Sequence, residues 1–202
     1  MFVVRWHAIP PTKNVEYTVY SDFACAECHG LNEQLAELGL SAVVHWRGVQ
    51  IDPATPVPMR PLDRRALDRI EDEIAEVRRR LDGVLMQLPR GKPNTLKAIV
   101  AVASVMRQQP GRAALFRDAL YRAYWHDGTD LSSVAELQRV ADATAVPRFV
   151  ELDHPDAEEI VENWDLDWAT ERLGGVPRVI RGDGKILWGL KPLAEAKAFF
   201  GV

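Results

Sequence analysis

Apolar residues at the N-terminal end of the chain change period twice, in the order strand, helix, strand. Residues 15–20 are β-branched and aromatic and predict a strand. Leucines at spacings of four and three then predict an amphipathic helix over residues 28–38, and Gly39 is a suitable C-terminal stop for it. Residues 41–46 predict a second strand. Together these elements form a βαβ unit, which implies that its two strands are parallel.

A long stretch of helical periodicity follows a Pro-rich connector. From Leu67 to Leu88 the apolar positions alternate spacings of three and four, as in a heptad seam. We expect a helix packed on its own domain; the alternative is a homodimer contact, which would also suit a non-enzymatic binding module. The basic run 78–80 follows an acidic stretch and is interpreted as a solvated helix face. Three more helices are predicted, over residues 95–108, 112–125 and 132–143.

The C-terminal part returns to mixed helix and strand patterns. A helix over 156–172 precedes two short β-branched runs that flank Asp183-Gly184, a strong hairpin signal. These runs predict strands over 178–181 and 185–188, and a closing helix over 192–200 has Pro at its first turn. The class is therefore α/β, and we expect a chain divided into residues 1–61, 62–150 and 151–202.

Composition and charge narrow the possible partners. The 202 residues are 47% hydrophobic and 27% charged, as in an ordinary globular protein, and the net charge of −4 argues against nucleic acid as a partner. No run of apolar residues is long enough to cross a membrane, so we expect no membrane association. The N-terminus lacks the basic start and apolar core of a secretory signal, which makes the cytoplasm the expected compartment.

The chain has two cysteines, Cys25 and Cys28, and they lie three positions apart. A disulfide between them would close too short a loop to stabilise the fold, so we expect their role to be chemical. Cys25 lies between a predicted strand and the start of a helix, where free N–H groups and the helix dipole favour a thiolate. A thiolate at Cys25 can attack a disulfide, and Cys28 is close enough to resolve the mixed disulfide.

A second candidate element is Val176-Pro177. An X–Pro bond adopts the cis form more readily than any other peptide bond, and cis prolines usually mark fixed tight turns. Pro177 directly precedes the predicted hairpin, so a cis turn there would bring the Val176 backbone beside the cysteines. Val146-Pro147 is the competing candidate, but no hairpin follows it.

These features resemble the DsbA-like branch of the thioredoxin superfamily over nearly the whole chain. The resemblance rests on the helical block, on Gly175-Val176-Pro177 with its hairpin, and on Tyr20-Ser21-Asp22-Phe23-Ala24-Cys25-Ala26-Glu27-Cys28. It implies a thioredoxin-like fold with an inserted all-helical domain. It also implies a thiol-disulfide oxidoreductase that acts on thiol or disulfide substrates and needs no bound cofactor. By the same resemblance Cys25 is the nucleophile, Cys28 the resolving thiol and Pro177 the cis-proline beside them.

The same branch includes 2-hydroxychromene-2-carboxylate isomerases and kappa-class glutathione transferases, which usually have serine at the first cysteine position. Three segments are similar to stretches in them: Pro93-Asn94-Thr95, residues 122–131 and Trp188-Gly189. The alternative function is therefore a glutathione-dependent isomerase or transferase that uses Cys25, with glutathione as co-substrate and Asn94 in a small-molecule site. The second thiol favours redox chemistry, because an isomerase does not need it.

The dipeptide between the cysteines departs from the usual DsbA pattern, with Ala26 in place of proline and Glu27 where His or Trp is common. A carboxylate at Glu27 disfavours the thiolate, whereas His29 favours it if protonated. We therefore expect a pair less oxidising than that of DsbA.

Metal and haem sites use the same cysteine spacing. The Cys-X-X-Cys-His run matches the c-type haem attachment pattern. It lies in a predicted βαβ unit, however, rather than in an all-helical fold around a haem. A zinc site made by Cys25, Cys28 and His29 would need a fourth ligand from another histidine, and the sequence has no second paired motif. The candidates for that ligand are His7, His45, His126 and His154. We expect neither haem nor metal.

Overall fold

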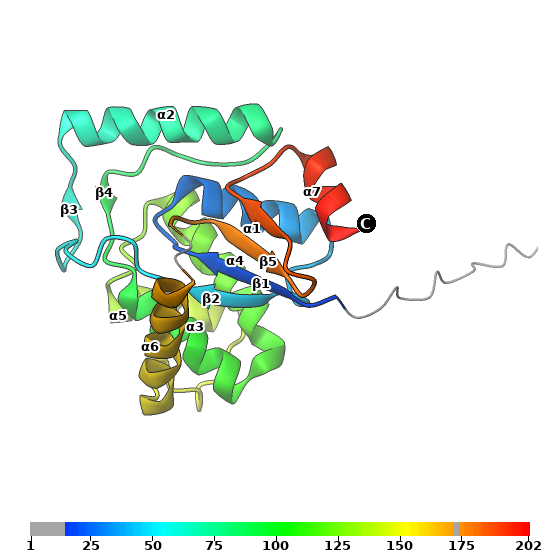
Figure 1. Ribbon diagram of the computed structural model, residues 1–202. Helices are drawn as coiled ribbons and strands as arrows, with labels where there is room; N and C mark the ends of the chain where they lie inside the picture. Colours follow the sequence, from blue (N-terminus) through cyan, green and yellow to red (C-terminus); the bar gives the residue numbers. More distant parts are fainter. Residues whose placement is uncertain (1–14, 172–173) are drawn as a thin grey trace, which may run out of the picture.

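A computed structural model describes residues 15–171 and 174–202 (Figure 1). The N-terminal segment, on which the expected compartment depends, lies outside these residues. His7 and the predicted helix end at residue 172 also lie outside them. The elements in chain order are β1 (Tyr17–Ser21), α1 (Ala26–Glu37), β2 (His45–Gly48), β3 (Arg60–Pro61), α2 (Arg64–Arg80), β4 (Gly91–Lys92), α3 (Leu96–Gln108), α4 (Pro110–Asp127), α5 (Val134–Ala143), α6 (Pro155–Thr170), β5 (Arg178–Arg181), β6 (Ile186–Trp188) and α7 (Leu193–Phe200).

The main sheet has four strands in the order β2-β1-β5-β6. Strands β1 and β2 are parallel, and β5 pairs antiparallel with both β1 and β6, so the predicted βαβ unit and C-terminal hairpin are confirmed. In the register Val19 of β1 lies between Trp46 of β2 and Val179 of β5, and all three are buried. The helices α2 to α6 come between β2 and β5 in the chain, together with the short strands β3 and β4, which pair antiparallel with each other. This gives the expected α/β class with an insertion that is largely helical, although the β3–β4 pair was not predicted. The exact domain boundaries stay a prediction.

Most elements begin and end within two residues of their predicted bounds, and two boundaries differ by more. The second strand begins at His45, because residues 41–44 form a turn in which the N–H groups of Val43 and Val44 donate to the Leu40 carbonyl. Helix α2 ends at Arg80, eight residues before the last leucine of the apolar seam. Its C-cap, Leu81, is extended, so the seam spacing continues beyond the helix without helical structure.

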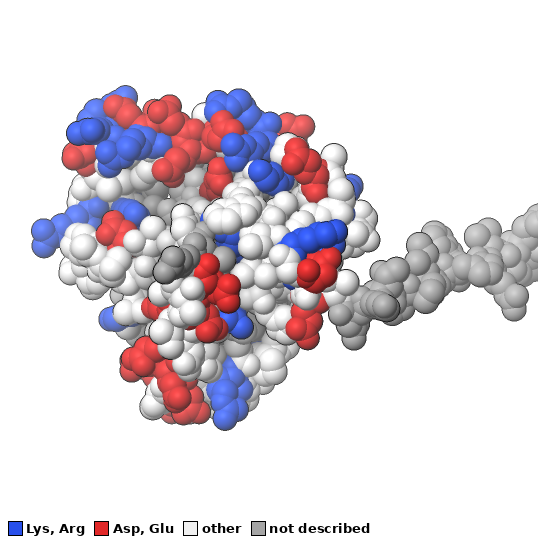
Figure 2. All heavy atoms as spheres, viewed as in Figure 1, with Lys and Arg blue, Asp and Glu red and all other residues white. Residues whose placement is uncertain are grey.

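Helix α2 runs along one side of the molecule, next to α1 (Figure 1). Ile74 and Val77 are buried in the central core, and Val77 packs closely against Gly30 of α1. Its outer surface carries mixed positive and negative charges (Figure 2). The helical part of the seam therefore packs inside the protein, against α1, and the homodimer contact stays an untested prediction.

Helix α4 holds the turn between β1 and α1 through two hydrogen bonds. The Trp125 indole donates to the Phe23 carbonyl at 2.9 Å, and the hydroxyls of Ser21 and Tyr121 lie 2.6 Å apart. All four side chains are buried. The insertion thus holds the segment that presents the cysteines. Within the described part of the chain, no helix is long and apolar enough to cross a membrane.

Candidate active site

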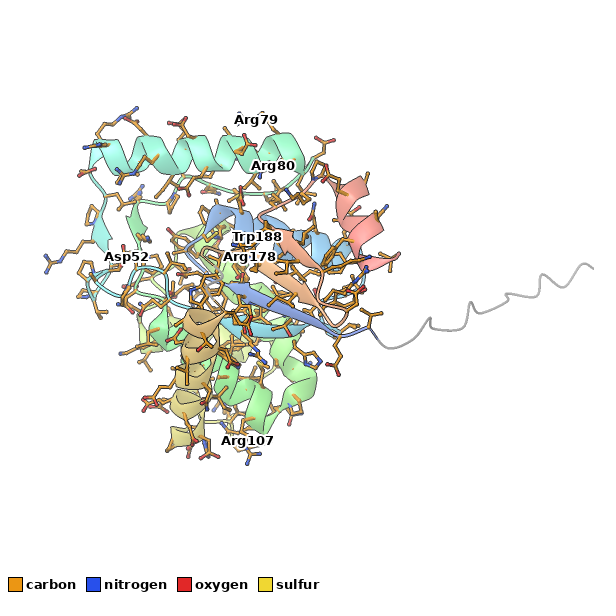
Figure 3. All side chains as sticks on the ribbon, viewed as in Figure 1. Asp52, Arg79, Arg80, Arg107, Arg178 and Trp188 are labelled. Atoms are coloured by element: carbon orange, nitrogen blue, oxygen red, sulfur yellow. The ribbon has the colours of Figure 1, made fainter. Side chains whose placement is uncertain are left out.

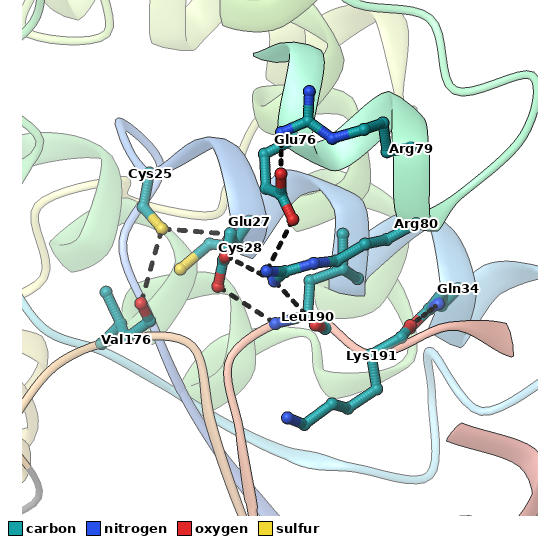
Figure 4. Close-up of polar contacts among 10 residues, drawn as sticks. All are labelled: Cys25, Glu27, Cys28, Gln34, Glu76, Arg79, Arg80, Val176, Leu190 and Lys191. Carbon is teal, nitrogen blue, oxygen red and sulfur yellow. Dashed lines mark hydrogen bonds and ion pairs between the residues drawn. The ribbon is translucent and has the colours of Figure 1, made fainter. Parts of the chain in front are cut away.

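Cys25 is the N-cap residue of α1. Its backbone is extended, and its Sγ accepts a hydrogen bond from the Cys28 N–H at 3.3 Å (Figure 4). Both cysteines are free thiols; Cys25 is partly exposed, whereas Cys28 is 1% exposed. An N-cap sulfur meets the unpaired N–H groups and the positive end of the helix dipole, which favour an anion. The structure thus combines an accessible sulfur at a helix N-terminus with a second, covered thiol one turn along.

The Val176–Pro177 bond is cis, as predicted, and the competing Val146–Pro147 bond is not. The Cys25 thiol donates to the Val176 carbonyl at 3.7 Å, so the loop lies directly against Cys25. The loop continues into β5, which pairs with β1, and the Pro177 carbonyl accepts the Gly189 N–H at 3.0 Å. A second cis bond, Val57–Pro58, was not singled out from the sequence.

Arg178 is buried directly after the cis-proline loop. Its guanidinium lies over the Trp188 ring of the neighbouring strand and donates to the Gly175 carbonyl at 3.2 Å (Figure 3). Burial lowers the pKa of Arg178 to about 10, so it is still a cation at neutral pH. Arg178 therefore connects the loop that faces Cys25 to β6.

Cys28 is held in its thiol form. Burial, followed by the neighbouring Cys25, raises the pKa of Cys28 well above its ordinary value, and hydrogen bonds from Ser21 and the Asp22 backbone oppose the shift only in part. A buried thiolate without full compensation is costly. Cys28 is therefore a neutral thiol at neutral pH.

Asp22 is a buried carboxyl in the turn before the cysteines, and no sequence pattern predicts its structural role. It accepts the Ala24 N–H at 3.0 Å and the Ile51 N–H at 2.8 Å, and burial raises its pKa. These bonds fasten the β1–α1 turn to the segment that follows β2.

A cavity of about 410 Å³ opens beside Cys25. Its walls come from the β1–α1 turn, the cis-proline loop, and the charged residues Glu73 of α2 and Lys92 of β4. Burial raises the pKa of Glu73, while Lys92 opposes the shift. The helical insertion therefore forms one wall of the site. Glu73 and Lys92 fit no motif, since only the tertiary fold brings them to the cysteines.

Glu27 does not have the environment expected from the sequence. Its Oε1 lies 2.8 Å from Arg80 Nη1, and its Oε2 accepts the Leu190 N–H at 3.1 Å (Figure 4). The carboxylate is thus paired, which weakens the argument that it disfavours the thiolate. The interpretation of residues 78–80 as a solvated face is wrong for Arg80, which is 33% exposed and reaches across to α1.

His29 is fully buried among aromatic rings. It stacks on Trp125 and Tyr121, meets the edge of His126, and its Nε2 lies 3.2 Å from the Leu85 carbonyl. Burial lowers the pKa of His29 to about 4, so the ring is neutral at neutral pH. The protonated ring on which its expected tuning role depended is therefore disfavoured.

Asn94 is not among the described residues that line the cavity beside Cys25. Its amide accepts from Gln50 at 2.7 Å and donates to the Thr55 carbonyl at 2.9 Å. Those contacts give it a role in joining loops. In residues 15–171 and 174–202 no group of three or more His, Cys, Asp or Glu side chains is arranged to hold a metal ion.

Comparisons with known proteins agree with this architecture. The family model of the DSBA-like thioredoxin domain matches residues 17–200. A probable DsbA oxidoreductase from Streptomyces coelicolor superposes with a TM-score of 0.73 at 17% identity, covering 93% of this chain and 90% of that one. The cytosolic disulfide reductase DsbM from Pseudomonas aeruginosa, solved with GSH, gives 0.70 at 13% identity, covering 92% and 97%.

A 2-hydroxychromene-2-carboxylate isomerase is similar to the same extent, with a TM-score of 0.69 at 19% identity, covering 92% of this chain and 94% of that one. No curated protein sequence matches the chain. At these identities the solved structures show the fold, whereas the family model spans almost the whole chain. The chain therefore belongs to the DSBA-like thioredoxin domain family.

Proposed function

We propose that this protein is a thiol-disulfide oxidoreductase that exchanges two electrons through Cys25 and Cys28. The observation that carries the proposal is the position of the Cys25 sulfur. It is partly exposed, caps α1, and lies 3.7 Å from the carbonyl of the cis-proline loop, with the buried Cys28 thiol one turn further.

The reaction divides into two exchange steps. The Cys25 thiolate attacks one sulfur of a substrate disulfide, which forms a mixed disulfide and releases the first substrate thiolate. Cys28 then loses its proton and attacks the Cys25 sulfur, which releases the second substrate thiolate and leaves a Cys25–Cys28 disulfide. Two electrons pass from the cysteine pair to the substrate, and the reverse sequence oxidises a dithiol.

The substrate would lie in the cavity beside Cys25, with the Val176 backbone as a hydrogen-bonding partner. We propose thiols or disulfides as substrates, glutathione as a possible co-substrate, and no bound cofactor or metal. The support from comparison is that one structural neighbour is named a cytosolic disulfide reductase and was solved with GSH. That name also supports the cytoplasm as the proposed compartment.

The alternative is a glutathione-dependent isomerase or transferase that uses Cys25 as its only reactive thiol. The similarity to a 2-hydroxychromene-2-carboxylate isomerase favours it. Against it, Asn94 is engaged by Gln50 and Thr55 rather than lining the cavity beside Cys25. A buried second thiol next to the first also has no role in such a reaction.

The variant Cys28→Ser separates the two functions. An oxidoreductase without its resolving thiol should accumulate stable mixed disulfides at Cys25, for example with insulin, which mass spectrometry detects. Cys25→Ser is the matched control and should form none. A glutathione-dependent activity that Cys28→Ser leaves intact, with no trapped disulfide, would favour the alternative.

A further inference from the structure

Arg80, the last residue of α2, bridges three segments of the chain. Its Nη1 lies 2.8 Å from Glu27 Oε1 and 3.1 Å from the Leu190 carbonyl, and its Nη2 lies 2.7 Å from Glu76 Oε1. Figure 4 shows the Arg80 guanidinium between the two carboxylates, close to the cysteines. Since the second oxygen of Glu27 accepts the Leu190 N–H, both of its oxygens are occupied.

The position of Glu27 explains why this pairing matters for chemistry. Glu27 lies in the first turn of α1, two residues after the N-cap sulfur of Cys25. An unpaired carboxylate there would repel a thiolate at Cys25, because like charges a few ångströms apart disfavour each other. The Arg80–Glu27 pair is about one-third exposed, and pairs of that kind add little to stability.

We infer that Arg80 is a positioning residue for Cys25: it neutralises Glu27 and holds its carboxylate against the Leu190 N–H, so that α2 sets the reactivity of the nucleophile. The inference rests on the proposed function, because it assumes that Cys25 reacts as a thiolate. It makes the helical insertion part of the control of the cysteine pair as well as a wall of the cavity.

The chain supplies a matched control in the neighbouring residue. Arg79 also pairs with Glu76, but its side chain is 65% exposed and its guanidinium lies on the far side of Glu76 from Glu27 (Figure 4). Arg79→Gln therefore removes one positive charge from the same turn of α2 and leaves the contact with Glu27 intact.

The test measures the rate at which iodoacetamide alkylates Cys25 between pH 5 and pH 9, in a Cys28→Ser background so that one thiol reacts. Arg80→Gln should slow alkylation roughly threefold near neutral pH and move the profile to higher pH, because Glu27 loses its counter-charge. Arg80→Lys should restore most of the rate, and Arg79→Gln should leave it within a factor of about 1.5.

A second variant, Glu27→Gln, distinguishes an electrostatic role of Arg80 from a purely structural one. Glu27→Gln should speed alkylation, and Glu27→Gln combined with Arg80→Gln should return the rate close to that of the parent protein. If Arg80 only maintains the local structure, both single variants slow the reaction and the double variant slows it further, which would overturn the inference. An unchanged pH profile in Arg80→Gln would overturn it as well.

Alkylation does not need disulfide exchange, so the inference and the proposed function can fail separately. Failure of the parent protein with both cysteines to form a Cys25–Cys28 disulfide in glutathione buffers would reject the oxidoreductase. The alkylation series would still decide whether Arg80 controls the reactivity of Cys25.

Discussion

The Cys25 thiol lies 3.7 Å from the Val176 carbonyl oxygen, although 151 residues separate the two in the chain. Two antiparallel pairings create this contact: β5 aligns with β1, and β6 aligns with β5. The helical insertion lies between β2 and β5 in the sequence, and it contributes Glu73 and Lys92 to the cavity beside Cys25. The contact therefore depends on the whole fold.

Resolution of a mixed disulfide should depend strongly on pH. Since burial raises the pKa of Cys28 well above its ordinary value, its thiolate fraction rises about tenfold per pH unit between pH 7 and pH 9. The reaction with 5,5′-dithiobis(2-nitrobenzoate) reports both steps: the first thiolate released marks formation of the mixed disulfide at Cys25, and the second marks its resolution. The second phase should accelerate with pH and vanish in Cys28→Ser. A second phase whose rate does not change across this range would show that the pKa of Cys28 is not raised.

Burial of His29 should make the protein less stable in mild acid. The folded protein protonates His29 at about pH 4, whereas the unfolded chain does so near the ordinary value of 6.5. The unfolded state therefore binds the proton first. The stability is intact above about pH 6.5 and falls by on the order of 3 kcal/mol as the pH drops to about 4.

Urea unfolding at pH 7.5 and pH 5 measures this loss. In His29→Gln the part of the loss that comes from His29 should disappear, whereas His45→Gln, at an exposed position, should retain it. An identical fall in stability for wild type and His29→Gln would show that the ring is not held neutral by burial.

Gly189→Ala should destabilise the protein more than Gly184→Ala. Both glycines have positive φ, 66° and 84°, where a side chain costs roughly 1–2 kcal/mol. Gly184 has open space for a Cβ, but a Cβ at Gly189 would lie 2.8 Å from Glu27 Oε2 and displace it from the Leu190 N–H.

A double-mutant cycle isolates that contact. With Glu27→Ala in the background, Gly189→Ala should cost no more than Gly184→Ala, as measured by urea unfolding. If the excess cost of Gly189→Ala persisted without Glu27, the packing of the 189–190 segment on Glu27 would not explain it.

Local patterns predicted most of the elements and the core of the site. The strand–helix–strand order around the cysteines predicted the parallel β1–β2 pair. The Val-Pro pair before an Asp-Gly hairpin predicted the cis bond at Pro177. These features are encoded within short segments, by period, turn residues and helix caps.

The remaining features depend on tertiary contacts. The sequence showed that Arg80 is charged, but not that α2 would end beside α1 and direct it to Glu27. Burial changed His29 in the same way: its position next to Cys28 suggested a titrating cation, whereas the aromatic rings of α4 keep it neutral. The apolar spacing continues to Leu88, but α2 ends at Arg80, because Leu81 has an extended backbone that spacing alone does not predict.

Equilibration in glutathione buffers of graded ratio decides whether Cys25 and Cys28 form one redox couple. After acid quenching and alkylation of free thiols, mass spectrometry should show one cooperative change from two alkylated cysteines to none. The serine variants, Cys25→Ser and Cys28→Ser, should show no intramolecular disulfide. Two cysteines that stay alkylated at every ratio, or that acquire glutathione without ever pairing with each other, would show that they are not a redox couple.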